Sequence, residues 1–274
     1  SFNTTLFMSL QKLLKKKKPL IMGVLNVTPD SFSDGGQFNT TEKAYDHALQ
    51  LIDEGADIID IGGESSRPGA IPVSFEDEMD RVLPVVKLLK KKSSIHISVD
   101  TYKSKLMQLV LDEGVDLIND IKALTGENSL QVIKCYEHAM VCMMHMQGDP
   151  LNMQNNPSYE NEIHLEIIKF FKNRLDVCLQ SGISLERFIL DPGFGFGKTF
   201  EHNWKIFQNM ETFTKLNYPL LIGLSRKSML KKIMGDREDW LDEATGFFSS
   251  KLVDKYPMII RTHNVKVTKK YLED

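Results

Sequence analysis

Asp100, Asn119 and Asp191 each stand directly after a short apolar run, and together they could bind a flat heterocycle. Two carboxylates and one amide offer hydrogen-bond acceptors and one donor pair. This set suits a planar ring edge with adjacent N–H groups, because an imperfect ligand would leave buried polar groups unpaired. Two alternatives stay open from the residue types alone: a divalent-metal site on the two aspartates, and a pair of structural helix N-caps.

Basic residues after two further apolar runs could bind a charged part of the same ligand. Lys227 could donate to a ring oxygen or nitrogen, whereas its neighbour Arg226 is expected to point away into an ion pair. Arg261 and His263 are two positions apart, so on an extended segment they face the same side. With Arg67 they would make an anion site, because arginine forks match phosphate oxygens bidentately.

The glycine-rich segment Pro192–Thr199 reads PGFGFGKT and is close to a phosphate-binding P-loop. It is one substitution short of that pattern, with Pro192 where the first glycine should stand. The aromatic residues inside it and the other strand–helix units of the chain argue against a nucleotide triphosphatase. We instead expect the loop to bring its backbone and Phe196 close to a ligand.

The elements that must position these residues are eight short apolar runs. They are nearly continuous in apolar residues, as expected for parallel strands with both faces buried. They cover residues 20–25, 58–61, 95–99, 117–118, 140–144, 188–190, 220–222 and 258–260. Polar side chains crowd the carboxyl ends of these runs, which is where barrel enzymes carry their chemistry.

Helical patterns fill several of the stretches between the runs. Residues 42–54, 75–91, 103–113 and 161–181 each place apolar residues on one face, and the last of them is expected to bury Phe170. Eight strand–helix units in about 250 residues predict an α/β protein with a (β/α)8 TIM-barrel fold, with an open doubly wound sheet as the alternative. No Pro/Gly/Ser-rich linker divides the chain. We therefore predict one barrel domain over 19–274 and an N-terminal extension or linker remnant over 1–18.

Composition and charge exclude several classes of protein. The formal net charge of −3 argues against a nucleic-acid binder that relies on a basic field. No apolar run approaches the roughly 20 residues that span a membrane, and residues 1–18 lack a signal-peptide cleavage site. The three cysteines are odd in number and none has C-x-x-C spacing. Reduced cysteines in a cytoplasmic protein are the expectation, not a disulfide framework or a zinc site.

Taken together, the motifs resemble those of the dihydropteroate synthases, and the resemblance runs from about Pro19 to Val265. It rests on eight segments in order, covering residues 23–36 (GVLNVTPDSFSDGG), 62–69 (GGESSRPG), 98–101 (SVDT), 118–121 (INDI), 144–148 (MHMQG), 191–198 (DPGFGFGK), 225–228 (SRKS) and 261–263 (RTH).

The resemblance implies a folate-pathway transferase with a (β/α)8 barrel. Such enzymes join 6-hydroxymethyl-7,8-dihydropterin diphosphate to 4-aminobenzoate and release 7,8-dihydropteroate and diphosphate. It also implies Mg²⁺ as cofactor, a homodimer and a sulfonamide target. A fusion of this chain to another folate-pathway enzyme is a further expectation.

Site residues follow by matching each motif. The pterin pocket would be formed by Asp100, Asn119, Asp191 and Lys227, with Met144 and Phe196 packed nearby. The diphosphate would meet Asn26, Ser66, Arg67, Arg261 and His263, and Asn26 would also be a magnesium ligand. The aminobenzoate would be held by Ser66, Pro68, Phe196 and Ser228. The catalytic set would be Asp34, Arg67, Lys227, Arg261 and His263.

The implied mechanism is a dissociative substitution. Asp34 would stabilise a pterin cation once its loop closes, and the two glycines after it suit a mobile loop. Two positions depart from the family pattern: Ser66 stands in place of threonine, and Asn264 in place of an aspartate.

Two rival functions remain at this point. A methyltetrahydrofolate-dependent methyltransferase domain would hold a pterin with a similar Asp/Asn/Asp set but would use no diphosphate. A non-catalytic pterin-binding module could lose the anion site. Arg67, Lys227 and the Arg261–His263 segment favour the synthase over both.

Overall fold

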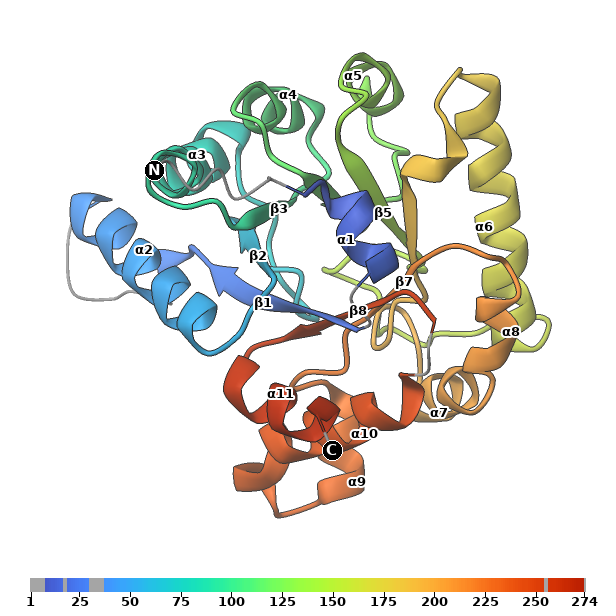
Figure 1. Cartoon of the computed structure of the whole chain (residues 1–274). Coiled ribbons are helices and arrows are strands. Elements are labelled where there is room, and N and C mark those ends of the chain that lie inside the picture. Colours follow the sequence, from blue (N-terminus) through green and yellow to red (C-terminus); the bar gives the residue numbers. More distant parts are fainter. Residues whose placement is uncertain (1–7, 17–18, 30–36, 254–255, 274) are drawn as a thin grey trace.

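The computed structural model describes residues 8–16, 19–29, 37–253 and 256–273, and within them eight parallel strands form a closed barrel in sequence order (Figure 1). The predicted (β/α)8 barrel is therefore confirmed, and the open sheet is excluded. The strands are β1 (Leu20–Asn26), β2 (Ile58–Gly62), β3 (His96–Asp100), β4 (Leu117–Asp120), β5 (Met140–Met144), β6 (Phe188–Asp191), β7 (Leu220–Ile222) and β8 (Met258–Thr262).

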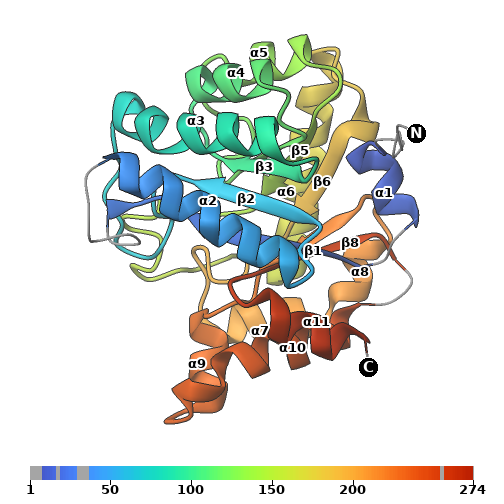
Figure 2. The same cartoon turned by 60° about the vertical axis from the view of Figure 1, so that its left-hand side comes forward.

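Helices surround the barrel (Figures 1 and 2). They are α1 (Leu10–Lys16), α2 (Gln37–Asp53), α3 (Phe75–Lys92), α4 (Ser104–Asp112), α5 (Ser129–Cys135), α6 (Ile163–Gln180), α7 (Phe200–Gln208), α8 (Met210–Thr214), α9 (Ser228–Met234), α10 (Leu241–Leu252) and α11 (Val265–Glu273). None of the helices in the described ranges is long and apolar enough to cross a membrane.

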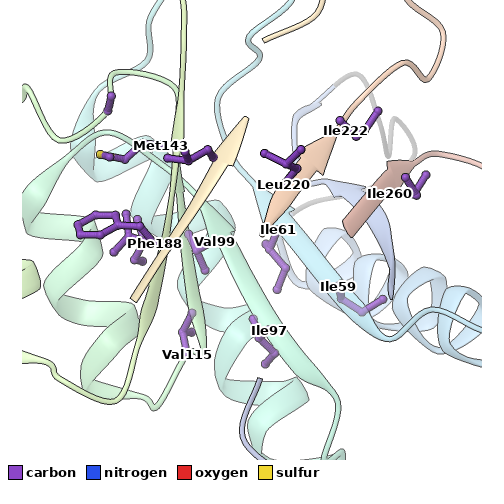
Figure 3. Close-up of a cluster of buried hydrophobic side chains, with 14 of the residues drawn as sticks. Ile59, Ile61, Ile97, Val99, Val115, Met143, Phe188, Leu220, Ile222 and Ile260 are labelled. Atoms are coloured by element: carbon purple, nitrogen blue, oxygen red, sulfur yellow. The ribbon is translucent and has the colours of Figure 1, made fainter. Parts of the chain in front are cut away.

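Each strand divides its side chains between two cores, because successive residues of a strand point to opposite faces. Outward-facing residues such as Ile59, Ile61, Ile97 and Val99 pack under the helices in the larger cluster (Figure 3). The alternate residues form a second cluster inside the barrel, made of Leu20, Met22, Ile58, Leu117, Met140, Cys142, Ile189, Leu221 and Ile259. Burying one such side chain contributes about 1.5–3 kcal/mol to the free energy of folding. The apolar interior of the barrel therefore gives a stable support for the strand ends.

Helix α1 belongs to this inner core. Leu10 and Leu14 are buried and join the cluster inside the barrel, next to Leu20 at the start of β1. Figure 2 shows α1 at the end of the barrel from which β1 starts. The sequence places the start of the barrel domain at residue 19, whereas two leucines before that boundary contribute to its core.

Two helices differ in detail from the sequence expectation. Helix α2 begins at Gln37, five residues before the predicted start at residue 42. In α6, Phe171 and not Phe170 is fully buried in the core. Phe170 is half-buried and meets the ring of His145 edge-on at 5.0 Å between centroids.

Candidate active site

The strand register brings the predicted polar residues to one level at the carboxyl ends of the strands. Gly62 of β2 is paired with Asn26 on one side and with Asp100 on the other. Asp100 is in turn paired with Asn119. Gly62 leaves room here: a Cβ at this position would lie 3.8 Å from Asp100 Oδ2 and 3.9 Å from Asn26 Oδ1. The side-chain oxygens of Asn26 and Asp100 therefore converge on one small space.

Asp191 closes the ring of polar groups from β6. It is buried, it pairs in register with Met144, and its Oδ1 accepts the backbone N–H of Gly193 at 2.8 Å. Burial raises the pKa of Asp191, and the charge of Lys227 and the Gly193 bond oppose that rise. Burial and the negative charge of Asp60 raise the pKa of Asp100 well above its usual range. Both carboxyls are thus poised to bind N–H groups of a ligand that replaces their lost water.

Asp60 is a site residue that the sequence analysis missed. It is 1% exposed on β2 and accepts the Nε–H of Arg261 at 2.8 Å and the hydroxyl of Ser98 at 2.8 Å. The Nη2 of Arg261 also lies 3.6 Å from Asp100 Oδ2. One signal was available in the sequence: a lone carboxylate inside an apolar strand, two positions after the inward-facing Ile58.

His263 lies on the same strand extension as Arg261 and is oriented by Ser225. The Ser225 Oγ accepts the backbone N–H of His263 at 3.1 Å and lies 2.7 Å from its Nδ1. We therefore assign the Ser225 hydroxyl as donor and the His263 Nδ1 as acceptor, which leaves Nε2–H as the free donor of the ring. Burial and the positive charges of Arg261, Arg226 and Arg67 lower the pKa of His263 to about 3. With its pKa lowered in this way, the His263 ring contributes a hydrogen-bond donor to the predicted anion site.

Lys227 lies beside the aromatic wall of the site. Its Nζ donates to the Phe194 carbonyl at 2.6 Å and sits 4.6 Å from the centre of the Phe196 ring. Burial lowers the pKa of Lys227 to about 8, against the raising effect of Asp191. A half-desolvated ammonium of this kind is suited to donate a hydrogen bond to a ring acceptor.

The neighbours of Lys227 point elsewhere. Arg226 adopts a left-handed backbone conformation (φ 58°) and pairs with Asp242 at 3.2 Å, which confirms the expected ion pair. Asn264 also donates to Asp242, at 3.1 Å. Ser228 is exposed at the first position of α9.

An apolar cluster completes one side of the site. It contains the two predicted residues Met144 and Phe196, and also Ile121 and Met153, which the sequence analysis missed. Tyr102 and Met146 pack against it half-buried. Such a surface suits a flat ring held by polar groups at its edge.

The glycine-rich loop after β6 does not form a phosphate site, because its lysine is already bound. Lys198 is 2% exposed and its Nζ donates to the carbonyls of His145, Gly193 and Phe196 at 3.2, 2.8 and 2.8 Å. Gly193 has φ 74°, and a Cβ there would meet the His145 carbonyl oxygen. The lysine and the glycine together fold the loop back on itself, which places Phe196 in the apolar cluster.

The loop after β2 supplies the remaining predicted residues. Ser66 is half-buried, and Arg67 and Pro68 are exposed. The charge of Arg67 contributes to the lowered pKa of His263, so it acts on the same space. Asp34 lies outside the described residues. Within the described ranges, no group of three or more His, Cys, Asp or Glu side chains could hold a metal ion on its own.

Comparisons with known proteins agree on one family. The model of the family described as "Pterin binding enzyme" matches residues 22–263. The dihydropteroate synthase of Haemophilus influenzae is 44% identical over 265 residues, which cover 96% of this chain and 94% of that protein.

Two solved dihydropteroate synthases share the fold. The Yersinia pestis enzyme, in a sulfonamide drug complex, has a TM-score of 0.84 at 40% identity and covers 93% of this chain and 92% of its own. The Xanthomonas albilineans enzyme, in complex with 7,8-dihydropteroate, has a TM-score of 0.83 at 34% identity, covering 94% and 92%.

Proposed function

The chain belongs to the dihydropteroate synthases, transferases of the folate pathway within the pterin-binding enzymes, and on that premise we propose its reaction. It condenses 6-hydroxymethyl-7,8-dihydropterin diphosphate with 4-aminobenzoate to give 7,8-dihydropteroate and diphosphate. The related Xanthomonas albilineans enzyme was solved with that product, and the Yersinia pestis enzyme with a sulfonamide, which mimics aminobenzoate.

The position of Arg261 carries the proposal. Its Nε is held by Asp60 at 2.8 Å, and its Nη2 lies 3.6 Å from Asp100. The guanidinium therefore joins the acidic pocket to the strand end where His263 lies. A ligand with a hydrogen-bonding ring at one end and an anionic group at the other matches both halves of this site.

The pterin ring would occupy the acidic half. Asp100, Asn119 and Asp191 accept and donate along its amidine-like edge, while Met144 and Phe196 cover its faces. Lys227 donates to a ring acceptor from the side of the Phe196 ring. Each of these hydrogen bonds is stronger in the buried site, because little water is present there to compete for the same donors and acceptors.

The reaction is a dissociative substitution. The bond between the pterin methylene carbon and the diphosphate oxygen breaks, and its electron pair leaves with the diphosphate. Arg261, Arg67 and the Nε2–H of His263 stabilise the charge that develops on that oxygen. The electron-rich pterin carries the resulting cation, and Asp34, which follows β1 in the sequence, stabilises it. The aminobenzoate nitrogen then forms the new C–N bond and loses its proton.

Direct attack by the amine suits this site better than a covalent enzyme intermediate. Ser225 lies beside His263, as a nucleophile lies beside its base. Its oxygen accepts the His263 backbone N–H, however, and it is buried. We assign Ser225 to orient the imidazole.

Asn26 is the residue that would hold Mg²⁺. Its Oδ1 lies at the carboxyl end of β1, 3.9 Å from the position that a Cβ on Gly62 would take. Mg²⁺ commonly takes one or two protein oxygens and completes its shell with water and substrate phosphates, so one amide oxygen at this strand end fits it. When bound, the ion would neutralise part of the charge on the diphosphate.

An assay of diphosphate release tests the reaction. The protein is incubated with the pterin diphosphate and Mg²⁺, with and without 4-aminobenzoate, and both diphosphate and dihydropteroate are quantified. Equal amounts of both products that depend on aminobenzoate are expected. Pterin binding without release would indicate a non-catalytic module, and methyl transfer in a separate incubation with methyltetrahydrofolate would indicate a methyltransferase domain. Either result would overturn the proposal.

We also propose that the enzyme is a cytoplasmic homodimer. The large apolar side chains of Ile233, Trp240 and Phe247 are exposed on α9, the 3-10 helix at 238–240 and α10. Exposed apolar groups that cluster on neighbouring elements often mark protein contacts. Light scattering coupled to gel filtration should give twice the chain mass, and a monomer at micromolar concentration would contradict the dimer. Cell fractionation tests the location.

A further inference from the structure

Three charged residues meet beneath the loop after β2 and are part of no substrate contact described so far. Lys103, just before α4, donates its Nζ–H to Glu64 Oε1 at 2.9 Å and to Glu78 Oε1 at 2.6 Å. Glu64 follows β2, and Glu78 lies on α3 with its side chain 2% exposed. One ammonium thus bridges two largely buried carboxylates from different elements.

Glu64 also joins the two ends of the loop. Its Oε1 accepts the backbone N–H of Val73 at 2.8 Å. Residues 65–72 lie between these two positions and include the predicted substrate residues Ser66 and Arg67. A carboxylate that binds both ends of a loop determines the loop's span, and here Lys103 holds that carboxylate in place.

Packing contributes little to the position of this loop. Arg67, Pro68 and Gly69 are exposed, and Ile71 is 78% exposed. A cavity of about 140 Å³ lies against the loop, and Glu64, Ser65, Ala70, Tyr102 and Pro150 are among its lining residues. Other contacts also act here. Gly69 N–H donates to the Pro150 carbonyl and Arg81 Nη1 donates to the carbonyl of Gly63, the residue before Glu64, both at 2.8 Å. The Tyr102 hydroxyl also hydrogen-bonds the Glu64 side chain.

The same cluster connects the loop to the pterin pocket. Lys103 is three residues after Asp100, and its backbone N–H donates to Thr101 Oγ1 at 3.2 Å. The short segment 100–103 therefore places a pocket carboxylate at one end and the ammonium at the other. Burial raises the pKa of Glu78, and the hydrogen bond and charge of Lys103 oppose that rise, so the ammonium stabilises the charged form of a buried carboxylate.

We propose that Lys103, acting through Glu64, is a positioning residue that holds the β2 loop, with Ser66 and Pro68, in the geometry that binds 4-aminobenzoate beside the pterin pocket. This inference rests on the proposed function. Without the Lys103 ammonium, the two ends of the loop are free to move, and aminobenzoate must then order the loop as it binds. The affinity for 6-hydroxymethyl-7,8-dihydropterin, which lacks the diphosphate, depends on the pterin pocket and stays unchanged.

The test compares Lys103→Met with Lys103→Arg and with a matched control. Lys87→Met is that control: Lys87 on α3 pairs at 3.8 Å with Glu113, the residue after α4, so it bridges the same two helices away from the loop. Lys103→Met is expected to raise the KM for aminobenzoate about tenfold, the change that ~1.4 kcal/mol produces. The Kd for 6-hydroxymethyl-7,8-dihydropterin should stay within about twofold by calorimetry. Lys103→Arg should recover most of the loss, and Lys87→Met should match the wild type.

A second readout is independent of turnover. Amide hydrogen exchange at Gly69, Ala70 and Val73 should accelerate in Lys103→Met and not in Lys87→Met. If Lys103→Met fails to fold, Glu64→Gln replaces it, because the amide keeps an acceptor for Val73 and loses the charge that holds Lys103.

The outcomes separate the two proposals. An inactive wild type would overturn the proposed function and leave the exchange experiment to test the loop contact. An active wild type whose aminobenzoate KM and loop exchange are unchanged in Lys103→Met would overturn the positioning role. An equal rise in the aminobenzoate KM and the pterin Kd would overturn it as well, because the damage would then not be specific to the loop.

Discussion

Asp60 on β2 and Arg261 on β8 form an ion pair inside the barrel, with the Arg261 Nε 2.8 Å from the Asp60 Oδ2. The two strands lie on either side of β1. Because Asp60 occupies the Nε edge of the guanidinium, the remaining N–H groups are directed toward Asp100 and the open end of the barrel. The pair therefore orients a cation that would otherwise be free to rotate, and such preorganised charge is worth more in a desolvated site than in water.

Replacing Arg261 by alanine should lower the kcat for diphosphate release by about 10²-fold or more, the scale seen for single electrostatic catalytic groups. Rapid-quench measurement of diphosphate checks this value. Arg237→Ala serves as control, because Arg237 is exposed and its contacts, Asp239 at 3.9 Å and the Trp240 ring at 5.1 Å, lie outside the active site. Since Arg261→Ala leaves Asp60 buried without its partner, its unfolding should be measured too, with a loss of about 3–5 kcal/mol expected. A folded variant of normal rate would remove Arg261 from the mechanism.

Lys227 should give the pH profile an alkaline limb. Its pKa is lowered to about 8, so the donating ammonium is present below that pH and is lost above it. The kcat/KM for the pterin diphosphate should therefore fall as pH rises through about 8, since this parameter reports the free enzyme. Lys227→Arg should shift the limb to higher pH at a reduced maximum. Lys231→Arg, an exposed change in α9, should leave the profile as it is. A limb that stays in place in Lys227→Arg belongs to another group.

His145 should make the folded protein sensitive to acid. Burial, together with the charge of Lys198, lowers its pKa from 6.5 to about 2. Between these values the unfolded chain binds a proton that the folded chain does not, so the free energy of unfolding falls as pH drops below about 6.5. His145→Phe should weaken this dependence between pH 7.5 and 5, measured by urea denaturation. His138→Gln, at an imidazole that is exposed before β5, is the control. An equally steep dependence in His145→Phe would assign the effect to other groups.

Removal of the Asn26 amide should weaken the binding of Mg²⁺ to the enzyme. In Asn26→Ala the Mg²⁺ concentration that gives half-maximal rate should rise about tenfold, equivalent to ~1.4 kcal/mol of binding. Titration of EDTA-treated enzyme with Mg²⁺ measures this, and calorimetry with the bare pterin checks that the pocket is intact. The metal role fails if the Mg²⁺ dependence of Asn26→Ala equals that of the wild type.

The barrel and its polar end could be predicted from sequence because both rest on local patterns. A parallel strand buried on both faces needs a continuous apolar run, and the eight runs matched the strands to within two residues at each end. Asp100, Asn119 and Asp191 stood out because each ends such a run. Asp100 and Asn119 are paired in register, whereas Asp191 pairs with Met144, two residues beyond the Cys142 that pairs with Asn119, so their convergence depends on the register of the closed barrel.

Other residues could not be interpreted locally. Lys198 in a glycine-rich loop has the sequence context of a phosphate ligand, and only the fold of that loop delivers three carbonyls to its ammonium. Phe170 and Phe171 are neighbours, so a shift of one position in the helical stripe decides which is buried. The Lys103 bridge joins residues 25 and 39 positions apart, and no spacing rule predicts it.

What the sequence by itself determined was which side chains share a face of each strand, since direction alternates along a strand with a period of two. Asp60 shares the face of Ile58 by that alternation, and the closed barrel shows that this face points inward. What only the tertiary structure decided was which of these groups meet. Asp60 and Arg261 are 201 residues apart, and the closure of β8 onto β1 brings them within hydrogen-bonding distance. The pairing of charges depends on the register between strands, and it is barrel closure that sets this register.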